Sequence, residues 1–193
     1  LKAVIHDKER KHSYAVPFSN YSGIRRYLLP CHIYINEGKY SLDRGDILSQ
    51  DLKLAFLANP ENKQAQHHVI AFLALALQQI RSWLLSEHGD TYSGSIIWYM
   101  TMGLPATHSQ EQALVKVFEN IGTAAWIAST NNAVTPEAVE ESIARAQQLS
   151  TGSEPEIHED IVVDAEPEIT AQIYGLVSST AYNPSARNFY LMV

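Results

Sequence analysis

Glu166 is the residue whose type and setting best suit chemistry in this sequence. It follows an apolar run, Ile161–Val163, that is typical of a buried strand in a parallel sheet. It precedes Pro167, which suits the first position of a helix because its missing N–H costs no hydrogen bond there. Open α/β folds bind ligands at such strand-to-helix corners, so Glu166 is a candidate ligand-facing carboxylate. The alternative, which spacing alone favours, is a carboxylate that only complements the dipole of the helix.

The residues after Glu166 carry a family resemblance. Glu-Pro followed by Ala-x-x-Tyr-Gly-Leu, which ends at Leu176, resembles the segment before the second phosphate loop of DnaK-type chaperones and their actin-superfamily relatives. The resemblance implies that Glu166 is catalytic and faces the nucleotide-bound metal and the attacking water. It also implies ATP and Mg²⁺ as ligands, with no side chain of this chain binding the metal directly.

Two further positions follow from the same resemblance. Asp51–Leu57 resembles the helix that carries the catalytic lysine of the family, which makes Lys53 the matching residue. A solvated lysine on an amphipathic helix is the alternative for Lys53. Met102–Ala106 resembles the Val-Pro-Ala corner whose proline relays the nucleotide state, so the resemblance assigns that role to Pro105.

The match spans nearly the whole chain but departs from the family pattern in three places. The sequence contains no Gly-rich phosphate loop, and the resemblance puts one just before Leu1 and the other just after Val193. Glu111 falls roughly where an arginine relay residue is expected. Residues 130–159 have no obvious counterpart in the chaperones. We therefore expect the 193 residues alone to lack tight ATP binding.

Composition narrows the possible partners. The chain has 193 residues, a formal net charge of −7 and one cysteine, Cys31. A chain with a negative net charge lacks the large basic surface that nucleic-acid binding requires. The longest apolar run, Val69–Leu77, is too short to span a bilayer, and the start shows no signal-peptide pattern. We expect a cytoplasmic protein with no nucleic-acid or membrane partner.

Apolar periodicity, capping residues and turn residues predict the elements. The expected strands are Leu1–His6, Tyr14–Phe18, Leu28–Asn36, Lys39–Leu42, Ser95–Leu104, the strand at Ile161 and Asn188–Val193. The expected helices are Asp46–Leu57, Lys63–His88, Thr107–Ile121 closed by Gly122, Thr135–Leu149 and a helix from Glu168. Ala124–Ser129 is ambiguous between strand and helix. The β-α units of the second half imply a largely parallel sheet.

The pattern of elements predicts an α/β protein. The resemblance implies that it is an actin-like ATPase lobe, of the ribonuclease H-like class, with a peripheral α+β subdomain. Residues 1–92 would form the β-meander and helices of the peripheral subdomain, and residues 93–193 part of the central sheet. The expected function is a nucleotide-binding lobe of a DnaK-like or actin-like ATPase, incomplete as given, with a possible protein partner or client. The alternative is a non-enzymatic actin-like scaffold or interaction module. A sugar or acetate kinase of the same superfamily is a weaker third.

Overall fold

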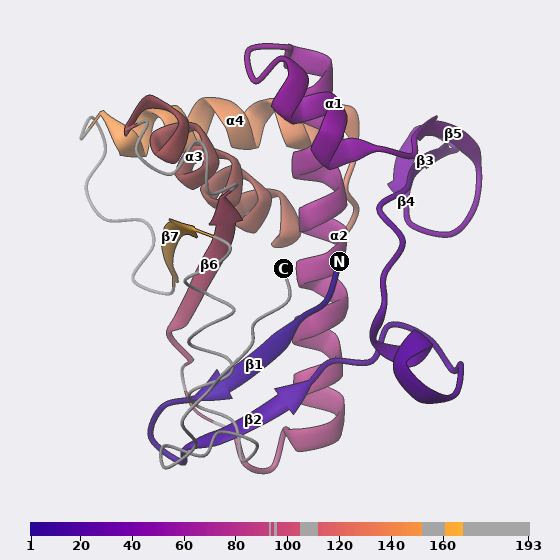
Figure 1. The fold of residues 1–193 in the computed structure, drawn as a ribbon, viewed down its shortest axis with the longest axis vertical. Helices are drawn as coiled ribbons and strands as arrows, with labels where there is room; N and C mark the ends of the chain where they lie inside the picture. Colours follow the sequence, from indigo (N-terminus) through magenta and orange to yellow (C-terminus); the bar gives the residue numbers. More distant parts are fainter. Residues whose placement is uncertain (93, 95, 105–111, 152–160, 168–193) are drawn as a thin grey trace, which may run out of the picture.

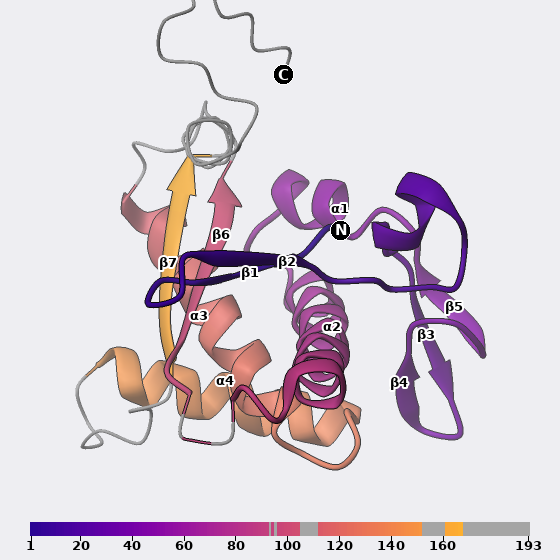
Figure 2. The same ribbon diagram turned by 90° about the horizontal axis from the view of Figure 1, so that it is seen from below.

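The protein is a mixed α/β structure in which helices lie between small sheets (Figure 1). The computed structural model describes residues 1–92, 94, 96–104, 112–151 and 161–167. Figure 2 shows helix α2 end-on, with helix α3 and strands β6 and β7 on one side of it and strands β3, β4 and β5 on the other. The α/β class predicted from the sequence is confirmed at this level.

Three long helices form the centre of the molecule. They are α2 (Lys63–His88), α3 (Gln112–Ser129) and α4 (Pro136–Ser150). The Asn62 side chain accepts a hydrogen bond from the backbone N–H of Ala65, and the Thr135 side chain accepts one from Ala138, so α2 and α4 both begin at a capping residue. The predicted bounds of α2 are confirmed, and those of α4 are confirmed to within a residue.

Within the described residues, the strands form three separate sheets. β1 (Val4–Asp7) pairs antiparallel with β2 (His12–Ala15), which confirms the first hairpin. In the second sheet β3 (Ile33–Asn36) lies between β4 (Lys39–Ser41) and β5 (Asp46–Ser49). In the third, β6 (Trp98–Leu104) pairs parallel with β7 (Ile161–Pro167). The short helices are η1 (Gly23–Tyr27) and α1 (Leu52–Ala58).

The helix predicted over Asp46–Leu57 is wrong in its first half. Asp46–Ser49 is strand β5, and only Leu52–Ala58 is helical. Gly45 reaches a φ of +116°, which a side chain would strain, and its turn brings β5 back along β3. Pairing with β3 therefore overrides the helical spacing of Ile47 and Leu48, and both side chains remain exposed.

Gly122 does not end a helix, contrary to the prediction. Helix α3 continues through it to Ser129, so Ala124–Ser129 is helical and nearly all buried. A glycine inside a helix costs stability, and here it gives the strands room to approach, as described below. The predicted start of this helix, at Thr107, lies outside the described residues, as do the expected helix from Glu168 and strand from Asn188.

One apolar core joins both halves of the chain. Ile33 and Tyr40 of the peripheral sheet belong to the same buried cluster as Phe72 of α2, Phe118 of α3 and Val139 of α4. The division into residues 1–92 and 93–193 stays a prediction.

Helix α2 also has the length and composition of a membrane span. Among the described residues it is the one helix that passes this test, with 26 residues and a mean hydropathy of 1.5 over its most apolar window. Core helices of soluble proteins pass the same test, and α2 contacts α1, α3, α4, β3 and β4. The absence of a membrane partner stays a prediction.

Candidate functional site

The exposed face of the parallel pair carries the candidate site. Strand β7 alternates, with Ile161 buried and Val162, Asp164 and Glu166 exposed. Its register sets Asp164 opposite Thr101 and Glu166 opposite Gly103, near the carboxyl ends of both strands. Because paired residues of neighbouring strands share a face, the two carboxylates and the Thr101 hydroxyl lie on one surface. We call Thr101, Gly103, Asp164 and Glu166 the acidic face.

Helix α3 holds the opposite face of the pair. A Cβ atom at Gly122 would lie 2.6 Å from Val163 Cγ1, 2.8 Å from Met100 Cε and 2.9 Å from Met102 Sδ. The missing side chain therefore lets both strands lie close against the helix. Trp126 of α3 adds an aromatic contact, with its ring centroid 6.0 Å from that of Trp98 at the start of β6. The acidic face is thus supported from behind by buried apolar contacts.

Two details of the prediction around Glu166 need correction. The strand continues through Glu166 and Pro167, and Pro167 pairs with Leu104, so Pro167 does not occupy the first position of a helix. The strand is also not buried on both faces, as the Ile161–Val163 run suggested, because Val162 is 42% exposed. Glu166 nevertheless lies at the carboxyl end of a parallel strand, which is the setting expected for a ligand-facing carboxylate.

Asp164 and Thr101 are members of the acidic face that the sequence analysis did not identify. Asp164 stands two residues before Glu166, and that spacing places two side chains on the same side of a strand. The alternation of Val162, Asp164 and Glu166 was the available signal. Carboxylate and hydroxyl oxygens are ligands that Mg²⁺ accepts, commonly through its own water molecules. Among the described residues, no group of three or more His, Cys, Asp or Glu side chains is placed to hold a metal ion directly.

Lys53 lies on α1, which is distant from β6 and β7 in the sequence. Helix α1 shares the apolar core with α3, the helix that supports these two strands. The Lys53 side chain is exposed, while Leu52 and Phe56 of the same helix are buried. The Phe56 ring lies 5.3 Å from the ring of Phe118 on α3. Helix α3 is therefore a common neighbour of the element that carries Lys53 and the one that carries Glu166.

Two other predicted features have different outcomes. Pro105, the expected relay residue, lies outside the described residues, as does Glu111. Residues 130–159, which have no counterpart in the resembled family, contain α4. Helix α4 packs against α2 and α3 and contributes Val139 and Ala146 to the core, so the described part of this segment, residues 130–151, belongs to the fold.

A second polar cluster ties the tip of the β1–β2 hairpin to the end of α2. Asp7 accepts hydrogen bonds from the backbone N–H of Arg10, from the Tyr92 hydroxyl at 2.8 Å and from the Arg10 guanidinium at 3.1 Å. The first of these is the main reason that the pKa of Asp7 falls to about 2. The Tyr92 hydroxyl also lies 3.3 Å from that of Tyr14, and these contacts raise the pKa of Tyr92. We call Asp7, Arg10, Tyr14 and Tyr92 the hairpin anchor.

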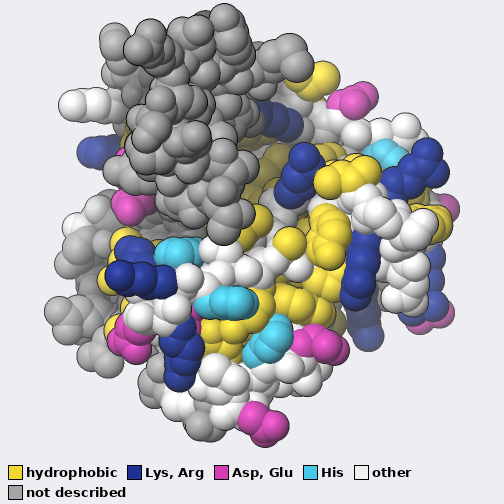
Figure 3. Space-filling view, turned by 60° about the horizontal axis from the view of Figure 1, so that its bottom comes forward, with side chains coloured by type: hydrophobic (Ala, Val, Ile, Leu, Met, Phe, Trp, Pro, Cys, Tyr) yellow, Lys and Arg dark blue, Asp and Glu magenta, His cyan; other side chains and the backbone are white. Residues whose placement is uncertain are grey.

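The surface around the hairpin anchor mixes charged, histidine and apolar groups. Figure 3, which brings the bottom of Figure 1 forward, shows histidine and basic side chains next to hydrophobic ones on this face. The Tyr14 ring contacts His88 at 4.4 Å and His12 at 4.6 Å between ring centroids. The four residues of the hairpin anchor, and His12 and His88 beside them, all have partners within the chain. The anchor therefore has the character of a structural contact, and the acidic face is the better candidate for chemistry.

Comparison of the chain with protein-family models, with curated proteins and with solved structures gives no match.

Proposed function

We propose that this chain is the nucleotide-binding lobe of an actin-like or DnaK-like ATPase. The observation that carries the proposal is the position of Glu166, exposed at the carboxyl end of a parallel strand pair and opposite Gly103. Ligands of α/β folds bind at that edge, and a glycine there leaves space for a phosphate to approach the backbone. The sequence resemblance assigns the same residue to the water-activating position.

The chemistry follows from the requirements of phosphoryl transfer to water. That reaction needs charge neutralisation at the γ-phosphate and an oriented water molecule. Lys53 would supply positive charge from the peripheral region. Glu166 would orient the water or accept its proton, and Asp164 would help to hold the hydrated Mg²⁺ of the nucleotide. Pro105 would couple the site to motion of the lobe and take no part in bond making.

The backbone cradle for the phosphates is expected from sequence outside residues 1–193. The resemblance puts one Gly-rich loop before Leu1 and the other after Val193, and backbone N–H groups of such loops supply most phosphate contacts. The decisive experiment therefore uses a protein that contains residues 1–193 together with both flanking loops. Calorimetry with MgATP on residues 1–193 alone should give no micromolar affinity.

The test is single-turnover ATP hydrolysis beside equilibrium nucleotide binding. Glu166→Gln keeps the shape of the side chain and removes its charge. We expect turnover to fall by roughly 100-fold or more while ATP affinity stays within a few-fold, because the carboxylate acts mainly in the transition state. Glu141→Gln, at an exposed carboxylate of α4, is the matched control and should leave turnover unchanged. Unchanged turnover in Glu166→Gln would remove this residue from the mechanism.

A scaffold is the second candidate, and a separate observation favours it. Ile47, Leu48 and Leu54 expose 52%, 36% and 68% of their surface on β5 and α1. Exposed apolar side chains of this size suit contact with another protein. If the longer protein neither binds nor hydrolyses ATP, and instead self-associates in sedimentation experiments, the scaffold replaces the ATPase.

A further inference from the structure

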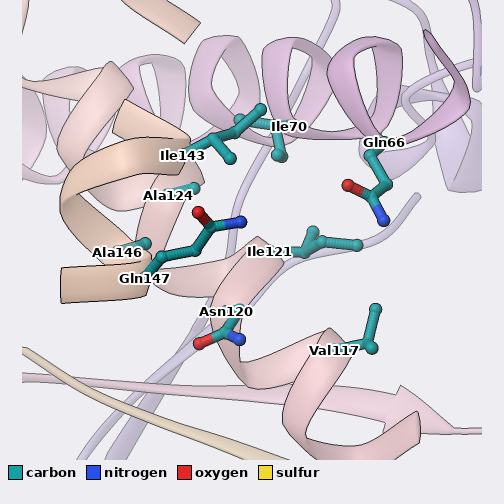
Figure 4. Close-up of a pocket in the computed structure, with 9 residues that line it drawn as sticks. All are labelled: Gln66, Ile70, Val117, Asn120, Ile121, Ala124, Ile143, Ala146 and Gln147. Atoms are coloured by element: carbon teal, nitrogen blue, oxygen red, sulfur yellow. The ribbon is translucent and has the colours of Figure 1, made fainter. Parts of the chain in front are cut away.

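A half-open pocket, here called the cavity, has a volume of about 140 Å³ and lies between the three long helices, away from the acidic face (Figure 4). Its apolar wall is made by three isoleucines, one from each helix: Ile70 of α2, Ile121 of α3 and Ile143 of α4. Ile70 and Ile121 are only 2% and 3% exposed, so this wall belongs to the core. An enclosed engineered cavity of about 150 Å³, lined only by apolar side chains, is large enough to bind benzene. The space therefore suits one six-membered ring.

Three carboxamides make the polar part of the lining, again one from each helix, and the smaller apolar residues Val117, Ala124 and Ala146 make up the rest. The carboxamides are Gln66 of α2, Asn120 of α3 and Gln147 of α4. Figure 4 shows the amide groups of Gln66 and Gln147 directed toward the space between the helices. Gln66 Nε2 donates a 2.6 Å hydrogen bond to the Pro60 carbonyl, which fixes the orientation of that side chain. All the lining residues that the structure describes are uncharged.

This lining selects a ligand by charge and by hydrogen bonding. An ionised ligand would lose hydration and find no opposite charge, which is costly, so the ligand should be neutral. Each carboxamide offers both a donor and an acceptor, the pattern that matches another amide edge. We propose that the cavity binds a small uncharged single-ring compound with an amide-like edge, the chemical class of benzamide and nicotinamide.

A contact beside the cavity joins two of the helices that line it. His67 Nε2 and Glu140 Oε2 lie 2.8 Å apart and join α2 to α4. His67 adjoins Gln66 in the sequence, and Glu140 precedes Ile143 by one helical turn. The contacts of α2 and α4 with each other and with α3 in the apolar core set the spacing of the walls, as expected for a largely preformed site. The inference does not depend on the proposed ATPase activity, since the acidic face contributes none of these residues.

The test is an NMR titration of the chain, with isoleucine methyl groups labelled, using benzamide as the probe. Benzamide should shift the methyl signals of Ile70, Ile121 and Ile143 in a saturable way, with a dissociation constant on the order of 1 mM for so small a ligand. Ile33, buried in the peripheral sheet, is the internal control and should not respond. Benzoate carries a charge, and acetophenone lacks the N–H donor of the amide. Each should bind about 3- to 10-fold more weakly than benzamide.

Matched variants locate the ligand. Gln147→Leu removes one carboxamide at an exposed position and should weaken benzamide binding about 3- to 10-fold. Gln148→Leu, at the exposed neighbour that does not line the cavity, should leave the affinity unchanged. No saturable shift at about 10 mM benzamide, where a ~1 mM ligand occupies most sites, overturns the proposal. Equal affinity in Gln147→Leu, or equal binding of benzoate, overturns it as well.

Discussion

The two small sheets beside the helices, the hairpin β1–β2 and the parallel pair β6–β7, are held in opposite ways. The hairpin closes locally, and the hairpin anchor joins its tip to the end of α2 through hydrogen bonds and ring contacts. The parallel pair joins strands that are separated in the sequence by α3 and α4, and it rests on buried apolar contacts with α3. Parallel strands need such a crossover, whereas a hairpin needs only its turn.

The difference shows why the candidate chemistry lies on the parallel pair. Apolar burial holds β6 and β7 from behind without using their polar groups, so Asp164 and Glu166 stay available on the opposite face. In the hairpin the polar groups themselves make the attachment, so Asp7 is committed to Arg10 and Tyr92. The two sheets also touch, because Lys8 Nζ at the hairpin turn lies 4.4 Å from the ring centre of Tyr99 on β6.

The largest expected effect concerns the support of the parallel pair. Trp126 is 5% exposed, contacts Trp98 and lies under the Arg81 guanidinium, 4.6 Å from the ring centre. Trp126→Ala should lower the free energy of unfolding by about 3–5 kcal/mol, because it leaves a large cavity under β6. Urea unfolding followed by circular dichroism measures this. A loss below about 1 kcal/mol would show that β6 does not depend on α3.

Gly122 gives a sharper test of the same contact. Gly122→Val would push a side chain against Val163, Met100 and Met102, and we expect a loss of about 1–3 kcal/mol despite the better helix propensity of valine. Gly94→Val is the matched control, since a Cβ there meets no atom within 4 Å, and it should change stability by less than about 0.5 kcal/mol. Equal midpoints for the two variants would contradict the close approach.

The same contrast explains what the sequence could predict. Helix α2 was predictable because a broad apolar stripe agrees with His88 in the last turn and Gly89 just after it. Helix α4 was predictable for the same reason, through Thr135 and Pro136. The β1–β2 and β3–β4 hairpins followed from local alternation and turns. Where several local signals agree within a short segment, the predicted element is present in the structure.

The incorrect predictions of secondary structure concern segments whose conformation is determined by contacts with other elements. Asp46–Ser49 looks helical but is held as a strand by β3, and Gly122 looks like a helix end but is kept for its contact with Val163. In the candidate site, Glu166 was found through a motif. Asp164 was missed because its place beside Glu166 becomes meaningful only once β7 is known to expose one face. The cavity between α2, α3 and α4 is lined by side chains from three helices, and no pattern within a single segment of the sequence predicts how they come together.

On the hairpin side we expect smaller effects. Tyr92→Phe removes the hydroxyl that donates to Asp7 at 2.8 Å, while Asp7 keeps its bonds to Arg10 and to backbone N–H groups. The urea midpoint should fall, but by less than in Gly122→Val, because the remaining donors still satisfy the carboxylate. Tyr21→Phe, at a residue that is 70% exposed, should leave the midpoint unchanged. A Tyr92→Phe midpoint equal to the wild-type value would mean that this hydroxyl does not stabilise the hairpin.

The smallest expected effect is a pH dependence that only the hairpin should show. Hydrogen bonds, above all from the backbone N–H of Arg10, lower the pKa of Asp7 from 3.8 to about 2 in the folded protein. A lowered folded-state pKa means that the ionised carboxylate stabilises the fold fully above the unfolded pKa, and that this contribution disappears as the pH falls from 3.8 through about 2. Asp7→Asn has no charge to lose, so the stability difference between wild type and this variant should shrink over that interval.

Urea midpoints of both proteins at several values between neutral pH and pH ~2 measure this difference, and the other carboxylates largely cancel because they are common to the two chains. Gly122→Val serves as the second comparison. Its contact with the parallel pair involves no titrating group, so its difference from wild type should stay constant over the same pH interval. If the Asp7→Asn difference is also constant, the ionised carboxylate does not hold the hairpin, and the hairpin must rest on the ring contacts of Tyr14 with His88 and Trp83.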